Sequence, residues 1–250
     1  MKIRFDSAPV HGKPWFRSPI NVITALCVND VADEFTLVDR AQRDGFWVAG
    51  FASYELVYAL EPRLVHLNLH LNRMCDTARR FGFRFSRRKA DEICDAIVSD
   101  KALRCRLTLG CDGEFNLITQ PLEPAKSIWR IAFSDVKLSH DDLWLRHKTN
   151  QRKIYDDARS NIPNGVDELL FFNQREELCE GTITNVFVQL ANGTWVTPPI
   201  SSGCLPGVLR QTLITSRFVT VRIVSQTEVS SARQIKIGNS LRGLLDVEWA

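Results

Sequence analysis

The spacing of apolar residues changes repeatedly along this chain, and that change most constrains the fold. Apolar side chains at three- and four-residue spacing mark one face of a predicted helix: Leu67, Leu71, Met74, Cys75, Ala78 and Phe81. Residues 104–110 and 127–133 instead alternate apolar and polar side chains, as half-buried strands do. Because segments of both kinds follow one another, the sequence predicts a mixed α/β (α+β) fold.

The same patterns predict the remaining elements. Residues 45–54 read as a strand or hairpin, and Ser86 as the N-cap of a second helix. Further strands are predicted at 167–173, 180–189, 219–224 and 235–237, with helices near 154–159 and 205–217. Asn192-Gly193 is a strong hairpin turn signal, and Pro206 favours the first turn of the last helix. The polar stretch 139–142 is the predicted boundary between two domains, residues 1–135 and 140–250.

Charge and cysteine usage narrow the class of protein. Thirty-two basic against 29 acidic side chains leave a net charge of +3, mixed along the chain, which predicts neither nucleic-acid nor membrane-surface binding. No apolar run approaches the length of about 20 residues that crosses a bilayer. The N-terminus lacks an apolar signal region, and the 7 cysteines show no C-x-x-C spacing. We therefore expect a cytoplasmic protein with reduced thiols.

Few single residues suggest chemistry by themselves. His66 and His70 have a metal-ligand spacing, but no third ligand stands out, so we expect no metal site and interpret both as helix-surface or capping histidines. Cys179 and Cys204 lack a neighbouring His, and core packing explains them better than nucleophilic catalysis. The chain contains neither G-x-G-x-x-G nor a Walker loop.

Four motifs in order give the functional signal. They are H-L-N-R at 70–73, H-K-T-N-Q-R-K-I-Y-D-D-A at 147–158, E-G-T-I-T-N-V-F-V at 180–188, and L-P-G-V-L-R at 205–210. Together they resemble the class IV aminotransferase family, fold type IV of the pyridoxal-phosphate enzymes, and within it the aminodeoxychorismate lyases. The resemblance covers about residues 66–245. It implies a small N-terminal α/β domain, a larger barrel-like C-terminal α/β domain, and pyridoxal 5'-phosphate as cofactor.

The resemblance also implies a role for particular residues. Lys148 would be bonded to the cofactor and act as the catalytic base, and nearby Arg146 and Arg152 would favour loss of its proton. Glu180 would face the pyridine nitrogen. The remaining cofactor-binding residues would be Arg73, Leu205, Val208, Leu209, Asn239 and Ser240, the two at 208–209 offering helix N-terminal donors to the phosphate. Substrate-side positions would be Arg152, Tyr155, Thr184 and Arg242.

The first quarter of the chain departs from the family. Its glycine-acid-glycine signature is missing after Asp39-Arg40, and Leu56 follows Glu55 where a threonine is usual. Residues 5–9, 20–23, 45–55 and 59–64 instead resemble the N-terminus of aminodeoxychorismate synthase component I, without that enzyme's chorismate-binding core. We do not expect the chain to bind chorismate as a synthase.

The activity implied by the resemblance is conversion of 4-amino-4-deoxychorismate to 4-aminobenzoate and pyruvate, a step of folate biosynthesis. Two alternatives stay open: an aminotransferase for branched-chain or D-amino acids, and a cofactor-dead relative with a binding or assembly role. By analogy with the family we expect a homodimer acting on a small molecule, with an aminodeoxychorismate synthase as a further candidate partner.

Overall fold

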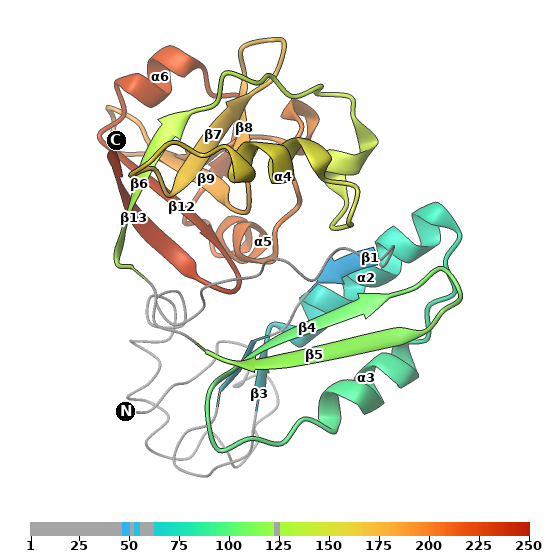
Figure 1. Cartoon of the computed structure of the whole chain (residues 1–250). Coiled ribbons are helices and arrows are strands. Elements are labelled where there is room, and N and C mark those ends of the chain that lie inside the picture. The colour runs from blue at the N-terminus through green and yellow to red at the C-terminus, as the bar shows by residue number, and fades with distance from the viewer. Residues whose placement is uncertain (1–46, 51–52, 56–62, 123–125) are drawn as a thin grey trace. The chain divides into compact units, whose positions relative to one another are not determined.

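The structure is a computed structural model in which residues 47–50, 53–55, 63–122 and 126–250 are described (Figure 1). The chain divides into two compact units. The first contains residues up to 125 with 148–150 and 240–243, and the second contains 126–147, 151–239 and 244–250. The synthase-like motifs at 5–9 and 20–23, most of 59–64, and the departures at Asp39-Arg40 and Leu56 lie outside the described residues.

In its described residues, the first unit is an antiparallel sheet with two helices. Strand β4 (Leu103–Leu109) pairs along one edge with β5 (Phe115–Pro121) and along the other with β1 (Trp47–Gly50) and β2 (Ser53–Glu55). Strand β3 (Arg63–Val65) continues the sheet beyond β2. Helices α2 (Leu67–Phe81) and α3 (Arg87–Asp95) lie between β3 and β4 in the chain. The predicted helices and the strand near 104–110 are thus confirmed.

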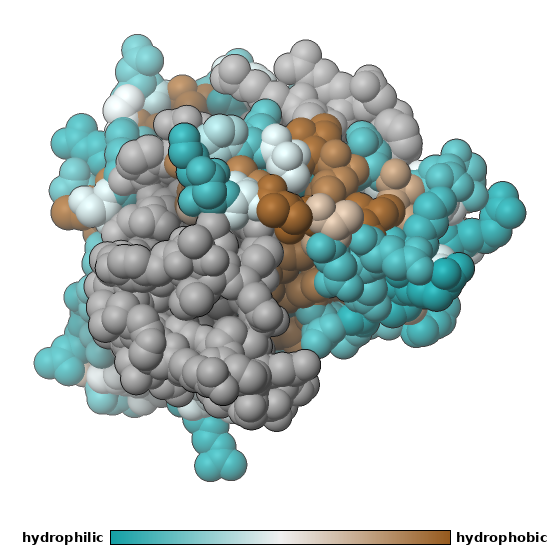
Figure 2. Space-filling model, turned by 90° about the horizontal axis from the view of Figure 1, so that it is seen from below, coloured by the Kyte–Doolittle hydropathy of each residue, from teal (hydrophilic) through white to brown (hydrophobic). Residues whose placement is uncertain are grey.

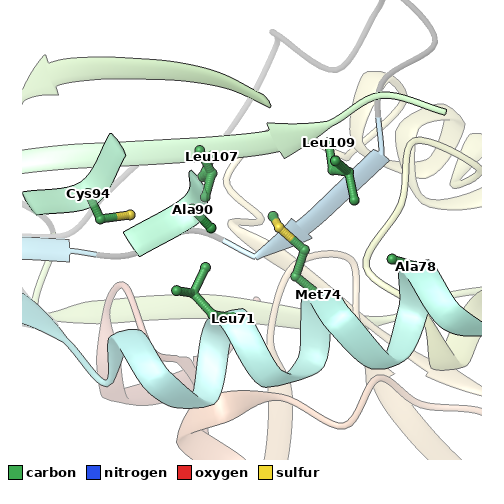
Figure 3. Close-up of a cluster of buried hydrophobic side chains, with 7 residues drawn as sticks. All are labelled: Leu71, Met74, Ala78, Ala90, Cys94, Leu107 and Leu109. Atoms are coloured by element: carbon green, nitrogen blue, oxygen red, sulfur yellow. The ribbon is translucent and has the colours of Figure 1, made fainter. Parts of the chain in front are cut away.

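The core of this unit explains why both helices form. Leu71, Met74 and Ala78 recur at helical spacing and point from α2 toward Ala90 and Cys94 of α3 and toward Leu107 and Leu109 of β4 (Figure 3). Helix α2 ends at Gly82, whose φ of 74° closes the last turn. Helix α3 begins after Ser86, whose hydroxyl accepts the Lys89 N–H at 3.3 Å.

The second unit is built on an eight-stranded mixed sheet in the order β11-β10-β9-β12-β13-β6-β7-β8. These strands are β6 (Ile128–Phe133), β7 (Glu168–Phe172), β8 (Leu178–Gly181), β9 (Asn185–Gln189), β10 (Trp195–Thr197), β11 (Thr220–Val221), β12 (Gln234–Asn239) and β13 (Gly243–Trp249). Its helices are α4 (Lys153–Ser160), α5 (Val208–Thr215) and α6 (Gln226–Ser230), with 3-10 turns at Leu143–Arg146 and Ile200–Ser202. The mixed α/β fold predicted from the sequence is confirmed.

Three sequence predictions need correction in this unit. Residues 128–133, assigned to the first domain, form β6 and pair in parallel with β7 and β13. The single strand predicted over 180–189 is two strands, because residues 181–184 form a tight turn in which the Gly181 N–H donates to the Thr184 carbonyl at 2.8 Å. The helix predicted over 205–217 is α5, which begins at Val208 rather than Leu205, since Gly207 is its extended N-cap with φ −65° and ψ 146°.

On the face drawn in Figure 2, most of the coloured residues are hydrophilic. In the space-filling view of one face, a band of hydrophobic residues interrupts the hydrophilic ones (Figure 2). Elsewhere, large apolar side chains such as Val98 and Ile223 are exposed singly, which is usual on folded proteins. Among the described residues, no helix combines the length and hydropathy that a membrane crossing needs.

Candidate active site

Glu180 is the centre of a polar cluster in the second unit. It stands near the end of β8 and is 6% exposed. The Tyr155 hydroxyl donates to Glu180 Oε1 at 2.6 Å, and the Leu205 backbone N–H donates to Oε2 at 3.0 Å. The Asn185 amide lies 3.5 Å from the same Oε2. Both oxygens of the carboxylate are therefore fixed by donors that come from α4, from β9 and from the loop before α5.

Tyr155 is suited to remain a donor. Its side chain is buried and packs edge-on against Phe171, with ring centroids 5.3 Å apart. Burial, and then the negative charge of Glu180, raise the pKa of Tyr155 well above its ordinary value. The phenol therefore keeps its proton, and its hydrogen bond with Glu180 persists over the whole neutral range.

Asn185 connects the Glu180 cluster to the start of α5. Its side-chain N–H donates to the Leu205 carbonyl at 3.0 Å. Its other amide atom, Oδ1, lies against Gly207, where an added Cβ would stand only 2.0 Å away. Since Gly207 has an ordinary φ, its glycine is required by this close approach and not by backbone strain. Asn185 was only part of a motif in the sequence, with no role assigned to it.

The start of α5 has the geometry of an anion site. Val208 and Leu209 are the first two helical residues, and the first N–H groups of a helix have no partner within it. The helix dipole adds a partial positive charge at that end. Arg210 fixes the preceding loop by donating to the Pro198 carbonyl at 2.8 Å. A helix N-terminus that packs closely on Asn185 through Gly207, together with the buried Glu180 carboxylate that Asn185 also contacts, suits a phosphorylated pyridine: Val208 and Leu209 for its phosphate, Glu180 for its ring nitrogen.

Two other predicted site residues bind the 181–184 turn, Gly181 to Thr184, and a third, Thr184, belongs to it. Asn239 donates from its side chain to the Ile183 carbonyl at 3.0 Å. The Arg152 guanidinium donates to the Thr182 carbonyl at 2.9 Å and pairs with Asp156 at 2.8 Å. Thr184 is buried and donates its hydroxyl to Glu168 at 2.9 Å. Their cofactor-binding and substrate-side roles stay predictions, but Asn239 and Arg152 have defined contacts with the turn, and Thr184 has one with Glu168.

A carboxylate that the sequence analysis did not single out lies beneath this turn. Glu168 is fully buried, and its oxygens accept the backbone N–H groups of Thr182 at 2.9 Å and Ile183 at 3.2 Å. The only signal in the sequence was an acidic residue at the head of the apolar run 169–172.

A second polar cluster ties the β7–β8 hairpin to the 3-10 turn at 200–202. Glu177 accepts hydrogen bonds from Ser202 at 2.7 Å, Asn173 at 2.9 Å and Arg175 at 2.8 Å. Burial alone would raise the pKa of Glu177, but these hydrogen bonds hold it below its ordinary value. The cluster therefore holds the segment that runs on to Leu205.

The first unit holds the remaining predicted residues. Lys148 is 9% exposed and Arg242 is 2% exposed, whereas Arg73 is half-buried on α2. Ser240 also belongs to this unit, although its neighbour Asn239 belongs to the second. Burial favours the unprotonated lysine that the predicted role of Lys148 requires, and the side chain of Lys148 is buried.

His70 corrects one sequence interpretation. It is not on the helix surface, since it is 3% exposed, and its Nε2 lies 2.9 Å from the Ser240 hydroxyl. Burial first, and then the charges of Arg73 and His66, lower its pKa well below the ordinary value. A neutral imidazole thus joins α2 to the 240–243 segment. His66 precedes α2 with a left-handed φ of 51°.

The buried Glu180 carboxylate and the N-terminus of α5 are typical of an enzyme that binds a phosphorylated cofactor. Comparison with known proteins identifies the family. The family model for amino-transferase class IV matches residues 52–248, so the chain belongs to that family, whose members depend on pyridoxal phosphate.

Three similar proteins narrow the comparison. The aminodeoxychorismate lyase of Saccharomyces cerevisiae is 26% identical over 46% of this chain, which spans only 32% of the yeast protein. A candidate aminodeoxychorismate lyase of Schizosaccharomyces pombe is 22% identical over 73% of this chain and 83% of its own length. The solved structure of a candidate amino-acid aminotransferase from Mesorhizobium loti is 33% identical, with a TM-score of 0.75, covering 82% of this chain and all of that one.

Proposed function

We propose that this chain is a pyridoxal-phosphate-dependent lyase that converts 4-amino-4-deoxychorismate to 4-aminobenzoate and pyruvate. The observation that carries the proposal is the pairing, within one unit, of the held Glu180 carboxylate with the glycine-lined start of α5. The names of the two yeast relatives support the lyase reaction.

The residues have distinct tasks in this proposal. Bound pyridoxal phosphate supplies a ring that withdraws electrons from the substrate carbon bearing the amine. Glu180, fixed by Tyr155 and Leu205, would stabilise a proton on the ring nitrogen of the bound cofactor. Val208 and Leu209 would offer backbone N–H groups to the phosphate, and the role of Arg73 as a cation for it is the one that the family resemblance implies.

Lys148 would hold the cofactor and, once displaced by the substrate amine, take the proton from the amine-bearing carbon. The enolpyruvyl C–O bond would then break, and the group would leave as enolpyruvate, which becomes pyruvate by taking a proton at its methylene carbon. The substrate ring becomes aromatic in this step, which makes the elimination strongly downhill. Lys148→Ala should therefore abolish turnover and the visible absorbance of the bound cofactor, while leaving the protein folded.

The direct test supplies purified protein with pyridoxal phosphate and 4-amino-4-deoxychorismate and measures 4-aminobenzoate by its fluorescence. Product formed by this chain alone would support the proposal and remove the need for a synthase partner. Cofactor binding without aminobenzoate formation would overturn the lyase reaction. A wild-type protein that binds no pyridoxal phosphate would favour the cofactor-dead alternative.

The second candidate function is an amino-acid aminotransferase. The 33% identity to the Mesorhizobium loti protein over its whole length favours it. Measuring keto-acid formation from a panel of branched-chain and D-amino acids with 2-oxoglutarate separates the two reactions, because a lyase needs no keto-acid acceptor.

A further inference from the structure

We propose that Glu168 is a positioning residue that places Glu180 and Asn185 for cofactor binding by holding the turn between them. The inference rests on the proposed function in one respect: the ligand whose binding it governs is pyridoxal phosphate.

Glu168 contacts the 181–184 turn through both carboxylate oxygens. Oε1 accepts the Thr182 N–H at 2.9 Å and also the Thr182 hydroxyl. Oε2 accepts the Ile183 N–H at 3.2 Å and the Thr184 hydroxyl at 2.9 Å. Sheet register explains the reach: Leu170 of β7 stands opposite Gly181 of β8, so Glu168, two residues earlier on β7, is level with the turn.

All four of these partners donate hydrogen bonds, so the side chain at position 168 must accept through both of its oxygens. A carboxylate has two acceptor oxygens and no proton, whereas an amide would present an N–H₂ group to one pair of donors. The hydroxyls of Thr182 and Thr184 could rotate to accept from an amide, but the two backbone N–H groups could not. Arg159 adds a cation 3.6 Å from Oε1, which balances the buried charge.

The outer side of the same turn is held as well. Arg152 donates to the Thr182 carbonyl, and Asn239 donates to the Ile183 carbonyl. Gly181 leaves no room for adjustment, since a Cβ there would stand 2.4 Å from the Thr184 hydroxyl and 2.8 Å from the Glu168 carboxyl. The turn is thus fixed from both sides, and Glu168 supplies the contacts from within.

The turn matters for cofactor binding because the two residues that flank it belong to the candidate site. Glu180 precedes it directly, and Asn185 follows it directly and packs against Gly207 at the start of α5. A change in the turn therefore shifts both the carboxylate meant for the ring nitrogen and the amide beside the phosphate-binding end of α5. A side chain that served folding alone would not change these two positions in the folded protein.

The test compares Glu168→Gln with a matched control, Asp167→Asn. Both substitutions turn an acid into its amide at neighbouring positions, but Asp167 bonds the Arg130 N–H at 2.9 Å and Lys126 at 2.7 Å instead of the turn. Each protein is titrated with pyridoxal phosphate, followed by visible absorbance, and the apo forms are compared by hydrogen–deuterium exchange over residues 181–185.

Loss of one hydrogen bond to a charged group changes an equilibrium constant about tenfold. We expect Glu168→Gln to bind pyridoxal phosphate about tenfold more weakly, to shift its absorbance band, and to exchange faster over 181–185. Asp167→Asn should match the wild type in all three. Wild-type affinity or wild-type protection of the turn in Glu168→Gln would overturn the inference.

If Glu168→Gln does not fold, Thr182→Val provides a second test of the same inference. It removes one hydrogen-bond donor to Glu168 and leaves the carboxylate in place. We expect a smaller weakening of cofactor binding in the same direction, and no change would overturn the inference. A wild-type protein that binds pyridoxal phosphate but forms no aminobenzoate overturns the proposed reaction alone. A wild-type protein that binds no pyridoxal phosphate overturns both.

Discussion

Replacing Gly207 with alanine tests the join between the Glu180 cluster and α5. The new Cβ would lie 2.0 Å from Asn185 Oδ1 and 3.1 Å from its Cγ. Ordinary contact begins at 3.4 Å, so the amide must move by about 1.4 Å. Its 3.0 Å bond to the Leu205 carbonyl and its approach to Glu180 cannot both survive such a shift.

The magnitude follows from these contacts. A buried hydrogen bond that is lost costs about 1–3 kcal/mol, because the carbonyl is left without its donor. The backbone at Gly207 suits alanine, and the smaller freedom of the unfolded chain offsets roughly 0.4–1 kcal/mol. We expect a net loss of about 1–2 kcal/mol, which lowers the melting temperature by roughly 2–8 °C.

Gly82→Ala provides the matched control. Gly82 has a φ of +74° with nothing within 4 Å of an added Cβ, so the substitution introduces backbone strain without a collision. Strain of this kind costs about 1–2 kcal/mol, similar to the loss expected for Gly207→Ala. The two variants therefore differ in what they disturb more than in how much stability they lose.

The assay is thermal unfolding with and without pyridoxal phosphate, because a ligand that binds only the native state raises the melting temperature according to its affinity. Wild type and Gly82→Ala should gain the same increment from the cofactor, whereas Gly207→Ala should lose most of it. A Gly207→Ala protein with the wild-type melting temperature and the wild-type increment would refute the reasoning.

Three further predictions concern side chains near the site and in the core. Tyr155→Phe removes the donor to Glu180 Oε1 and should lower the free energy of unfolding by about 2 kcal/mol in a urea titration; an unchanged value would contradict the assigned bond. Glu177 has a lowered folded-state pKa, so its stabilisation is full above its ordinary pKa of 4.5 and is lost as the pH falls through the lowered value. The melting-temperature difference between wild type and Glu177→Gln should therefore shrink below pH 4.5, and a constant difference would count against it. Burial raises the pKa of Cys94 to about 11 and of Cys105 and Cys204 to about 12, so a native alkylation experiment at pH 8 should modify exposed Cys111 well before these three.

Helices α2 and α3 were predicted well because their signals are local. Helix α2 has a helical apolar stripe and a terminal glycine, and α3 has a serine cap, all within a few residues of each element. The turn signal at Asn192-Gly193 is equally local, and the strands before and after it, β9 and β10, pair as an antiparallel hairpin. Strand partners were not predictable in this way, since β6 pairs with β7 and β13, distant in the sequence.

The part of the site that lies within the sequence motifs was predictable. The resemblance named Glu180, Tyr155 and Leu205, and the structure brings these three together. It did not yield Glu168, because one acidic residue at the head of an apolar strand has no pattern of its own. Only the pairing of β7 with β8 makes its carboxylate level with the turn.

Most residues of the motif E-G-T-I-T-N at 180–185 therefore shape the turn, and few of them face the proposed cofactor site. Glu180 faces the Tyr155 hydroxyl, but Thr182 and Thr184 both donate to Glu168, and Gly181 is tight against the same carboxyl group. A motif of this kind specifies a turn that is complete only when a residue from another strand enters it. Substitutions in the turn should thus act first on cofactor affinity, through the placement of Glu180 and Asn185, and on the chemical step only as a consequence.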